Sequence, residues 1–223
     1  MTRLGLTQRV TVVEEYGERR DCLDQAWTRL LEPAGYVPVP LSNEIVDVEQ
    51  YLERLAFDGI ILTSGNDLAH LTDASNPAPE RDRFETAVLD WAVDHGLPVL
   101  GVCRGLELLN DYFGGSLSRI DDHVATEHPV HFHSILEDAP IRGEDSSVPK
   151  QTVVNSYHDY GIRREDVGNS LAILGTAPDG TVECVVHETH PVCGIMWHPE
   201  RASPSTTVDQ QLFRNLFRGD RYG

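Results

Sequence analysis

Short apolar runs alternate with segments of helical periodicity through the first half of this chain. Four runs have the length of buried strands, at residues 4–7, 36–41, 59–62 and 97–100. Between them, apolar residues recur every three or four positions, which predicts amphipathic helices at about 21–35, 48–55 and 79–95. Strands that alternate with helices in this way predict a parallel, doubly wound sheet.

The second half of the chain favours antiparallel pairing. A strand resumes at 152–154, and three closely spaced apolar runs predict a meander, at 171–176, 182–186 and 192–197. The Asp-Gly pair at 179–180 is a hairpin-turn signal, and a closing helix is predicted at 206–217. The acidic segment 137–150 is predicted to be a surface loop. We therefore predict an α/β fold in one domain of 223 residues, with a doubly wound, mostly parallel central sheet, flanking helices and a small antiparallel meander.

The charge of the chain excludes two classes of binding protein. Acidic residues number 36 against 18 basic ones, for a net charge of -18, and Lys150 is the only lysine. Nucleic acids and anionic membranes are bound by basic patches, so neither is expected as a partner. An anionic substrate would have to be met by individual arginines.

Cysteine usage and the N-terminus point to a reducing compartment. The four cysteines, at positions 22, 103, 184 and 193, include no CxxC pair, and we expect reduced thiols. No apolar run reaches membrane-spanning length, and the first residues lack a signal-peptide core. These features predict a cytoplasmic enzyme.

The segment Gly101-Val102-Cys103-Arg104-Gly105 has the spacing of a nucleophile elbow. It follows the apolar run 97–100 and precedes a helical pattern, so a sharp strand-to-helix turn is predicted at Cys103. Glycines two residues before and after Cys103 permit that turn. The turn would expose the thiol at the carboxyl edge of the sheet, at a helix N-terminus that favours the thiolate.

A cysteine nucleophile needs a base, and His198 is the candidate. It ends an apolar strand, and Glu200 stands two residues later, where its carboxylate can orient the imidazole. Cys103, His198 and Glu200 are therefore predicted to form a catalytic triad. His158 is a rival base, and a structural role is the alternative for it.

These motifs together resemble the class I glutamine amidotransferase family, specifically its peptidase C26 branch of gamma-glutamyl hydrolases. The resemblance rests on the GVCRG, WHPE and Thr63-Ser64-Gly65-Asn66-Asp67 segments, and Arg-Asp-Arg-Phe-Glu at 81–85 and Asn-Ser-Tyr-His at 155–158 extend it. It implies a flavodoxin-like fold and thioester chemistry that needs neither cofactor nor metal.

The resemblance also implies an oxyanion hole and contacts to the substrate. It assigns one oxyanion donor to Gly65, and the elbow assigns the other to the backbone N–H of Arg104. Ser64 replaces a glycine that is common in the family. The backbone of Asn155, Ser156 and Tyr157 would hold the glutamyl group.

Glu107 departs from this pattern, and the charged residues of the segment 81–85 have a structural interpretation. Glu107 stands where the family usually has a glutamine that contacts the glutamyl group. It would either bind the substrate's α-ammonium or be an exposed helix acid, and both readings stay open. Arg81, Asp82 and Glu85 are predicted to be helix-surface or capping residues, because acids early in a helix suit its dipole.

A histidine-rich segment at 121–133 raises the question of a metal. His131 and His133 would share one face of a strand, near His123 and His128. The ligand spacing is loose, so we expect these side chains to line the polar rim of the site or to form surface hydrogen bonds, with no metal bound.

The expected activity is hydrolysis of a gamma-glutamyl amide through a gamma-glutamyl thioester, with release of glutamate. Segments 7–9, 19–21 and 122–126 resemble a sub-branch that acts on gamma-glutamyl-CDP-amidate and frees cytidine diphosphoramidate. Arg9, Arg19 or Arg20 would then meet the diphosphate, and solvated surface charge is the alternative.

Two alternatives stay open. The chain carries no synthase domain, which favours a free-standing hydrolase, but a glutaminase subunit serving a separate synthase partner remains an alternative. So does a hydrolase of another gamma-glutamyl amine, such as gamma-glutamyl-GABA. The partner is a small-molecule substrate in each case, and association into a homo-oligomer is open.

Overall fold

A nine-stranded sheet forms the centre of the molecule. The computed structural model describes residues 2–133 and 150–217. The strand order is β4-β1-β5-β6-β13-β12-β11-β8-β9. The first five of these strands are parallel, namely β4 (Tyr36–Pro40), β1 (Thr2–Leu6), β5 (Gly59–Leu62), β6 (Val99–Val102) and β13 (Val192–Ile195).

The meander extends this same sheet with antiparallel strands. They are β12 (Val182–His187), β11 (Leu171–Thr176), β8 (Val124–Phe132) and β9 (Gln151–Tyr157). The turn between β11 and β12 is tight, with Gly180 at φ 88° and its N–H bonded to the Ala177 carbonyl at 3.0 Å. The short pair β7 (Ser118–Arg119) and β10 (Tyr160–Gly161), and the 3₁₀ turn η1 (Arg164–Asp166), lie outside the main sheet. The predicted loop at 137–150 lies almost entirely outside the described residues.

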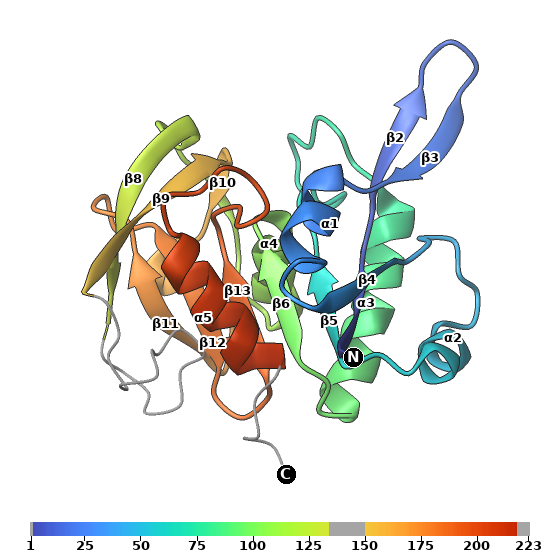
Figure 1. Ribbon diagram of the computed structural model, residues 1–223. Helices are drawn as coiled ribbons and strands as arrows, with labels where there is room; N and C mark the ends of the chain where they lie inside the picture. The colour runs from blue at the N-terminus through green and yellow to red at the C-terminus, as the bar shows by residue number, and fades with distance from the viewer. Residues whose placement is uncertain (1, 134–149, 218–223) are drawn as a thin grey trace.

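Helices cover both faces of the sheet, as Figure 1 shows. One apolar core packs α1 (Gln25–Leu31) and α5 (Thr206–Phe217) against one face, through side chains such as Trp27 and Leu212. The other packs α2 (Val48–Leu55), α3 (Pro79–Asp94) and α4 (Arg104–Tyr112) against the opposite face, through Leu52, Phe84 and Leu109. None of the described helices is both long and apolar enough to cross a bilayer. The mixed, mostly parallel sheet with flanking helices confirms the predicted fold class.

The structure corrects the prediction of a helix starting near Asp21. Residues Arg9–Val13 (β2) and Glu18–Cys22 (β3) instead form an antiparallel hairpin that projects from the body in Figure 1. The helix starts only at Gln25, where the Asp24 side chain accepts a hydrogen bond from the Ala26 N–H at 2.9 Å and so caps the first turn.

Candidate active site

Cys103 occupies a sharp turn between β6 and α4. Its backbone has φ 52° and ψ -108°, a conformation that costs a non-glycine residue free energy and is found at functional turns. A Cβ on Gly101 would lie 2.6 Å from the Gly105 backbone, and one on Gly105 would overlap the Leu62 carbonyl. Both glycines are therefore required for the close approach of helix and strand, as in a nucleophile elbow.

The Cys103 thiol is buried, and the groups around it shift its pKa in opposite directions. Burial raises its pKa well above the usual value, and the negative charge of Glu107 raises it further. A hydrogen bond from the Arg104 backbone N–H lowers it. In this resting arrangement the sulfur is a protonated thiol at neutral pH, so it needs a base to become a nucleophile.

His198 lies just beyond the end of β13 and is firmly oriented. Its Nδ1 donates to Glu200 Oε1 at 2.9 Å, and both side chains are buried. Asn155 holds the backbone on the other side, accepting from the His198 N–H at 2.8 Å and donating to its carbonyl at 3.0 Å. Nε2 is buried and has no hydrogen-bond partner among the described residues, so it is free to accept a proton.

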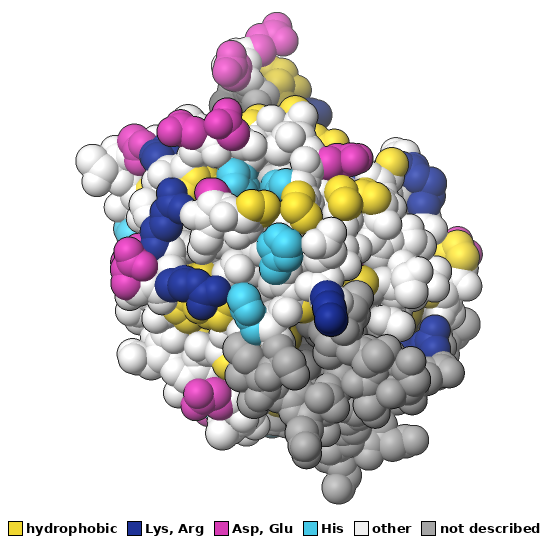
Figure 2. Space-filling model, turned by 90° about the vertical axis from the view of Figure 1, so that its left-hand side faces the viewer, with side chains coloured by type: hydrophobic (Ala, Val, Ile, Leu, Met, Phe, Trp, Pro, Cys, Tyr) yellow, Lys and Arg dark blue, Asp and Glu magenta, His cyan; other side chains and the backbone are white. Residues whose placement is uncertain are grey.

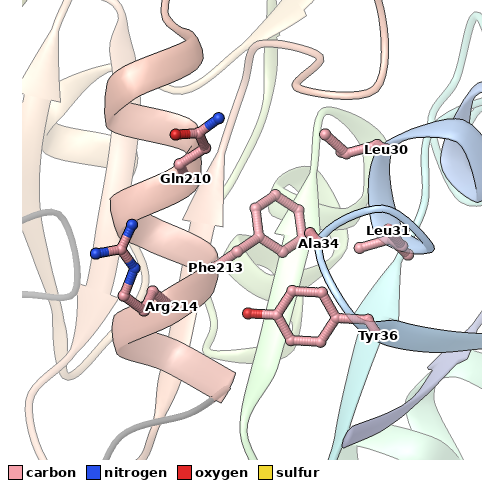
Figure 3. Close-up of a pocket in the computed structure, with 7 residues that line it drawn as sticks. All are labelled: Leu30, Leu31, Ala34, Tyr36, Gln210, Phe213 and Arg214. Atoms are coloured by element: carbon pink, nitrogen blue, oxygen red, sulfur yellow. The ribbon is translucent and has the colours of Figure 1, made fainter.

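One cavity of about 150 Å³ brings the predicted residues together. Its lining includes Arg9, Gly65, Cys103, Glu107, Tyr157 and His198. A second hollow, between α1 and α5, is lined by Leu30, Tyr36 and Phe213 among others and contains none of these residues (Figure 3). The candidate site is therefore the cavity at the carboxyl ends of β5 and β6, the edge where open α/β sheets bind ligands.

The loop 63–67 is held from below by a buried arginine. Gly65 has φ 87°, and the Arg81 guanidinium donates to the carbonyls of Thr63 at 2.5 Å, of Ser64 at 3.1 Å and of Gly65. These hydrogen bonds fix the position of the loop, and Ser64, Gly65 and Asn66 line the cavity. This arrangement corrects the prediction that Arg81 is a helix-surface residue, because its side chain is fully buried.

The same buried network fixes Arg104, the residue after Cys103. Arg104 pairs with the carboxylates of Glu85 and Asp82, and Glu85 also accepts from Arg81 Nε at 2.8 Å. Glu85 is fully buried too, so the surface prediction was wrong for it as well. Burial and the nearby charge of Arg104 lower the pKa of Arg81 to about 10, which still leaves it cationic at neutral pH. The network joins the loop 63–67 to the elbow.

The expected substrate contacts fall into two groups. Glu107 and Tyr157 line the cavity, and the exposed-acid alternative for Glu107 is wrong because its side chain is buried. Burial raises the pKa of Glu107 to about 7. Asn155 and Ser156 do not line the cavity, because Asn155 bonds the backbone of His198 and Ser156 Oγ donates to the His123 carbonyl at 2.6 Å.

Only one of the three candidate arginines lines the cavity. Arg9 lines the cavity, where its side chain packs over Gly65. Arg19 pairs with Glu80 and Arg20 with Glu18 on the exposed hairpin, so neither reaches the cavity. The surface-charge alternative is therefore correct for Arg19 and Arg20.

His131 and His133, which were expected to share one face of a strand, do not join the other histidines of this segment. His131 is exposed, and His133 contacts Thr176 at 3.2 Å and Arg164 at 3.1 Å. His158 donates from Nδ1 to the Tyr160 carbonyl at 2.8 Å, which matches the structural alternative given for it. Within residues 2–133 and 150–217, the group with the geometry to hold a metal is instead His123, His128, His158 and Glu183.

Comparison with known proteins gives the family. The profile of the family described as Peptidase C26 matches residues 4–200. This chain belongs to the peptidase C26 family. A gamma-glutamyl-CDP-amidate hydrolase of Campylobacter jejuni is 31% identical over 217 residues, which cover 96% of each chain. A gamma-glutamyl-gamma-aminobutyrate hydrolase of Escherichia coli O157:H7 is 28% identical, over 90% of this chain and 87% of that one.

A solved glutamine amidotransferase from Thermotoga maritima shares the fold. Its TM-score is 0.64 at 14% identity, with 100% of this chain and 86% of that chain covered. The peptidase C26 relatives support the assignment of this chain to the gamma-glutamyl hydrolases. The solved structure agrees with the α/β architecture described above.

Two features of the site have no simple signal in the sequence. The sequence of the buried Arg81–Glu85–Arg104 network is typical of charged residues on a helix surface. The i, i+4 spacing of Arg81 and Glu85 indicates only that these two can pair. Arg201 was also missed; it lines the cavity, and its guanidinium lies 4.3 Å from the ring centroid of Tyr157.

Proposed function

We propose that this protein is a cysteine-dependent hydrolase that cleaves a gamma-glutamyl amide through a gamma-glutamyl thioester. The observation that supports it is a single cavity holding Cys103 on a strained elbow and the free Nε2 of His198, which Glu200 orients. Membership of the peptidase C26 family supports the same class of reaction.

In the first half-reaction Cys103 attacks the δ-carbonyl carbon of the substrate. His198 Nε2 accepts the thiol proton, and the sulfur–carbon bond forms as the carbonyl π electrons move to oxygen. The backbone N–H groups of Gly65 and Arg104 stabilise that oxyanion by several kcal/mol. When the tetrahedral intermediate collapses, the carbon–nitrogen bond breaks and His198 protonates the departing amine.

In the second half-reaction water replaces the amine. His198 takes a proton from water as it adds to the thioester carbonyl, and the same oxyanion site stabilises the second tetrahedral intermediate. Collapse expels the Cys103 sulfur, which recovers its proton, and glutamate leaves. Glu200 holds the imidazole in one tautomer and stabilises its cationic form in both half-reactions.

We further propose that the leaving group is cytidine diphosphoramidate. The relative from Campylobacter jejuni supports this choice, and so does the distribution of cations around the cavity. The side chain of Arg104 is neutralised by two carboxylates, whereas Arg9 is 3.9 Å from the single carboxylate of Asp24 and 38% exposed. Arg9 is thus able to meet a diphosphate at the mouth of the cavity.

The proposed chemistry is tested by glutamate release from the purified protein. Glutamine, gamma-glutamyl-GABA and gamma-glutamyl-CDP-amidate are compared, with Cys103→Ala as the inactive variant and Cys22→Ala as the matched control. We expect turnover of gamma-glutamyl-CDP-amidate that is lost in Cys103→Ala and kept in Cys22→Ala. Equal turnover by Cys103→Ala would refute the nucleophile, and no turnover of any substrate by the protein alone would refute a self-sufficient hydrolase acting on these three.

The leaving group is tested separately with an arginine pair. Arg9→Gln is expected to raise the KM for gamma-glutamyl-CDP-amidate about tenfold while leaving gamma-glutamyl-GABA unchanged, because only the first substrate carries a diphosphate. Arg20→Gln removes the same charge from the exposed hairpin and is expected to change neither KM. Equal effects of Arg9→Gln on both substrates would contradict the diphosphate contact.

A further inference from the structure

Four side chains converge beneath the antiparallel end of the sheet. His123 precedes β8, His128 lies in β8, His158 follows β9, and Glu183 lies in β12. One nitrogen or oxygen atom from each lies within 4.8 Å of the others. His123, His158 and Glu183 are buried and His128 is half-buried. Figure 2 shows histidine side chains on the face formed by this end of the molecule.

Four of the six separations between these atoms are close to the edges of a metal-centred tetrahedron, and the other two are within 4.8 Å. His123 Nδ1 lies 3.3 Å from His158 Nε2 and 3.5 Å from Glu183 Oε1. Glu183 Oε1 lies 3.6 Å from both His128 Nε2 and His158 Nε2. In a tetrahedral zinc site with bonds of about 2.0–2.1 Å, neighbouring ligand atoms are about 3.3 Å apart. Contraction by a few tenths of an ångström would bring these four separations to that value, and His128 would move with them to close the site around an ion.

The outer nitrogen of each histidine faces a hydrogen-bond acceptor. His158 Nδ1 lies 2.8 Å from the Tyr160 carbonyl, and His128 Nδ1 lies 3.4 Å from the Pro129 carbonyl. His123 Nε2 faces the Asp179 carboxylate at 3.4 Å. An N–H directed at each acceptor leaves a lone pair on the inner nitrogen, which is the arrangement that orients metal-binding imidazoles.

The interior of the cluster is not satisfied by the protein alone. Both carboxylate oxygens of Glu183 and the Nε2 of His128 are buried without a hydrogen-bond partner among the described residues. Buried polar atoms without hydrogen bonds are destabilising, and the three imidazole nitrogens 3.5–3.6 Å from Glu183 Oε1 are within ion-pair distance but do not hydrogen-bond it. A cation at the centre would bind the Glu183 carboxylate and accept the three lone pairs at once.

We propose that His123, His128, His158 and Glu183 bind one Zn²⁺ ion in a structural site. Three imidazoles and one carboxylate are a ligand set that zinc favours, and four protein ligands leave no position for a substrate. The ion would link β8, β9 and β12 behind the cavity, because His158 also lines that cavity and Ser156 donates to the backbone of His123. This inference departs from the expectation that the chain holds no metal, and it is independent of the hydrolase chemistry.

The wild-type protein provides the first test. The full chain is treated with a chelator, freed of the chelator, and titrated with Co²⁺, whose absorption spectrum reports its coordination. We expect one equivalent to bind with the intense visible bands of four-coordinate Co²⁺, and one equivalent of Zn²⁺ to displace it. Binding of less than a stoichiometric amount, or the weak bands of six-coordinate Co²⁺, would overturn the proposal.

Matched variants locate the ion. His128→Ala and Glu183→Gln are expected to weaken Zn²⁺ affinity at least tenfold and to remove the Zn²⁺-dependent rise in Tm. His131→Ala is the control, because His131 lies in the same strand and is exposed. If Glu183→Gln does not fold, His128→Ala alone is compared with the wild type, because His128 is only half-buried. Zn²⁺ affinity in folded His128→Ala equal to that of the wild type would refute the site.

Discussion

Replacing Glu107 with Gln is expected to make the Cys103 thiol easier to ionise. Both side chains are buried in the same cavity, and burial raises the pKa of Glu107 to about 7. After burial, the charge of Glu107 is the next largest cause that raises the pKa of the thiol. Gln keeps the shape of the side chain and removes the charge.

The size of the effect follows from the position of the two residues on α4. Cys103 is the N-cap residue, and the Glu107 N–H donates to its carbonyl at 3.0 Å, so the two are i, i+4 neighbours about 6 Å apart. Two unit charges about 6 Å apart at an effective dielectric constant of about 20 interact with about 2.8 kcal/mol. At about 1.4 kcal/mol per factor of ten, the thiolate population of the variant should be up to about a hundredfold higher.

The effect should depend on pH in a defined way. Because Glu107 is half-protonated near pH 7, its charge opposes thiolate formation fully only above that pH. The reactivities of the variant and the wild type should therefore converge below about pH 6 and diverge above about pH 8.

Alkylation by iodoacetamide measures the thiolate directly. The rate at the Cys103 peptide is followed by mass spectrometry from pH 6 to pH 9, and the buried Cys184 and Cys193 report any general loosening of the fold. Asp111→Asn is the control, since it removes one acidic charge from the far end of the same helix. Superimposable pH profiles for Glu107→Gln and the wild type would refute the electrostatic coupling.

Three further changes test the structure around the site. Gly105→Ala is expected to destabilise the fold by about 1–3 kcal/mol in urea unfolding, because the new methyl group overlaps the Leu62 carbonyl; an unchanged midpoint would contradict the close packing. Glu85→Gln leaves two buried guanidinium groups short of a carboxylate and should cost about 3–5 kcal/mol in the same assay, whereas a cost below about 1 kcal/mol would mean that water enters the network. Burial raises the pKa of Asp209 to about 6, so the folded state binds more protons than the unfolded state from about pH 4 to pH 6 and loses stability across that window as pH rises. The unfolding free energy of Asp209→Asn relative to wild type should therefore improve by about 3 kcal/mol between pH 4 and pH 7, and a difference independent of pH would refute this assignment.

The elbow could be predicted because its determinants are local. The strained conformation at Cys103 needs small residues two positions away on each side, and the sequence displays that spacing directly. The pairing of His198 with Glu200 is local too, because two residues beyond a strand end suffice to bring the carboxylate to Nδ1 at 2.9 Å. That both motifs meet in one cavity required the parallel order of β6 and β13, which the alternation of strands and helices only implies.

The buried ion network was mispredicted because charge alone does not reveal burial. Arg81 and Glu85 stand four residues apart near a helix N-terminus, a pattern typical of solvated helix surfaces. Their burial follows from tertiary contacts, since Arg81 meets the carbonyls of the loop 63–67 and Glu85 meets Arg104 of α4. Only the fold brings these partners within reach.

The hairpin before α1 lacked a usable pattern for another reason. It projects from the body, so most of its side chains are exposed, and only Val10 among the residues of β2 is buried. Strand β3 reads Glu-Arg-Arg-Asp-Cys and has no alternation of apolar and polar residues. Strand β3 therefore carries no period-two signal, and the helix predicted from the apolar residues that follow it was extended too far toward the N-terminus.

The group of His123, His128, His158 and Glu183 could not be predicted from strand alternation because β8 contains a bulge. Side chains in a strand alternate between faces, and the sequence was therefore expected to place His131 with His133. The register of β8 against β9 shifts between Val124 and Thr126, where Ala125 adopts φ 55°. This bulge lets His123 and His128 point inward although they are five positions apart, an odd spacing that would otherwise put them on opposite faces. His131 then follows the alternation from His128 and faces solvent. Glu183 comes from β12, and a spacing rule within one segment cannot predict its position. The group of four side chains therefore becomes visible only once β8, β9 and β12 are assembled.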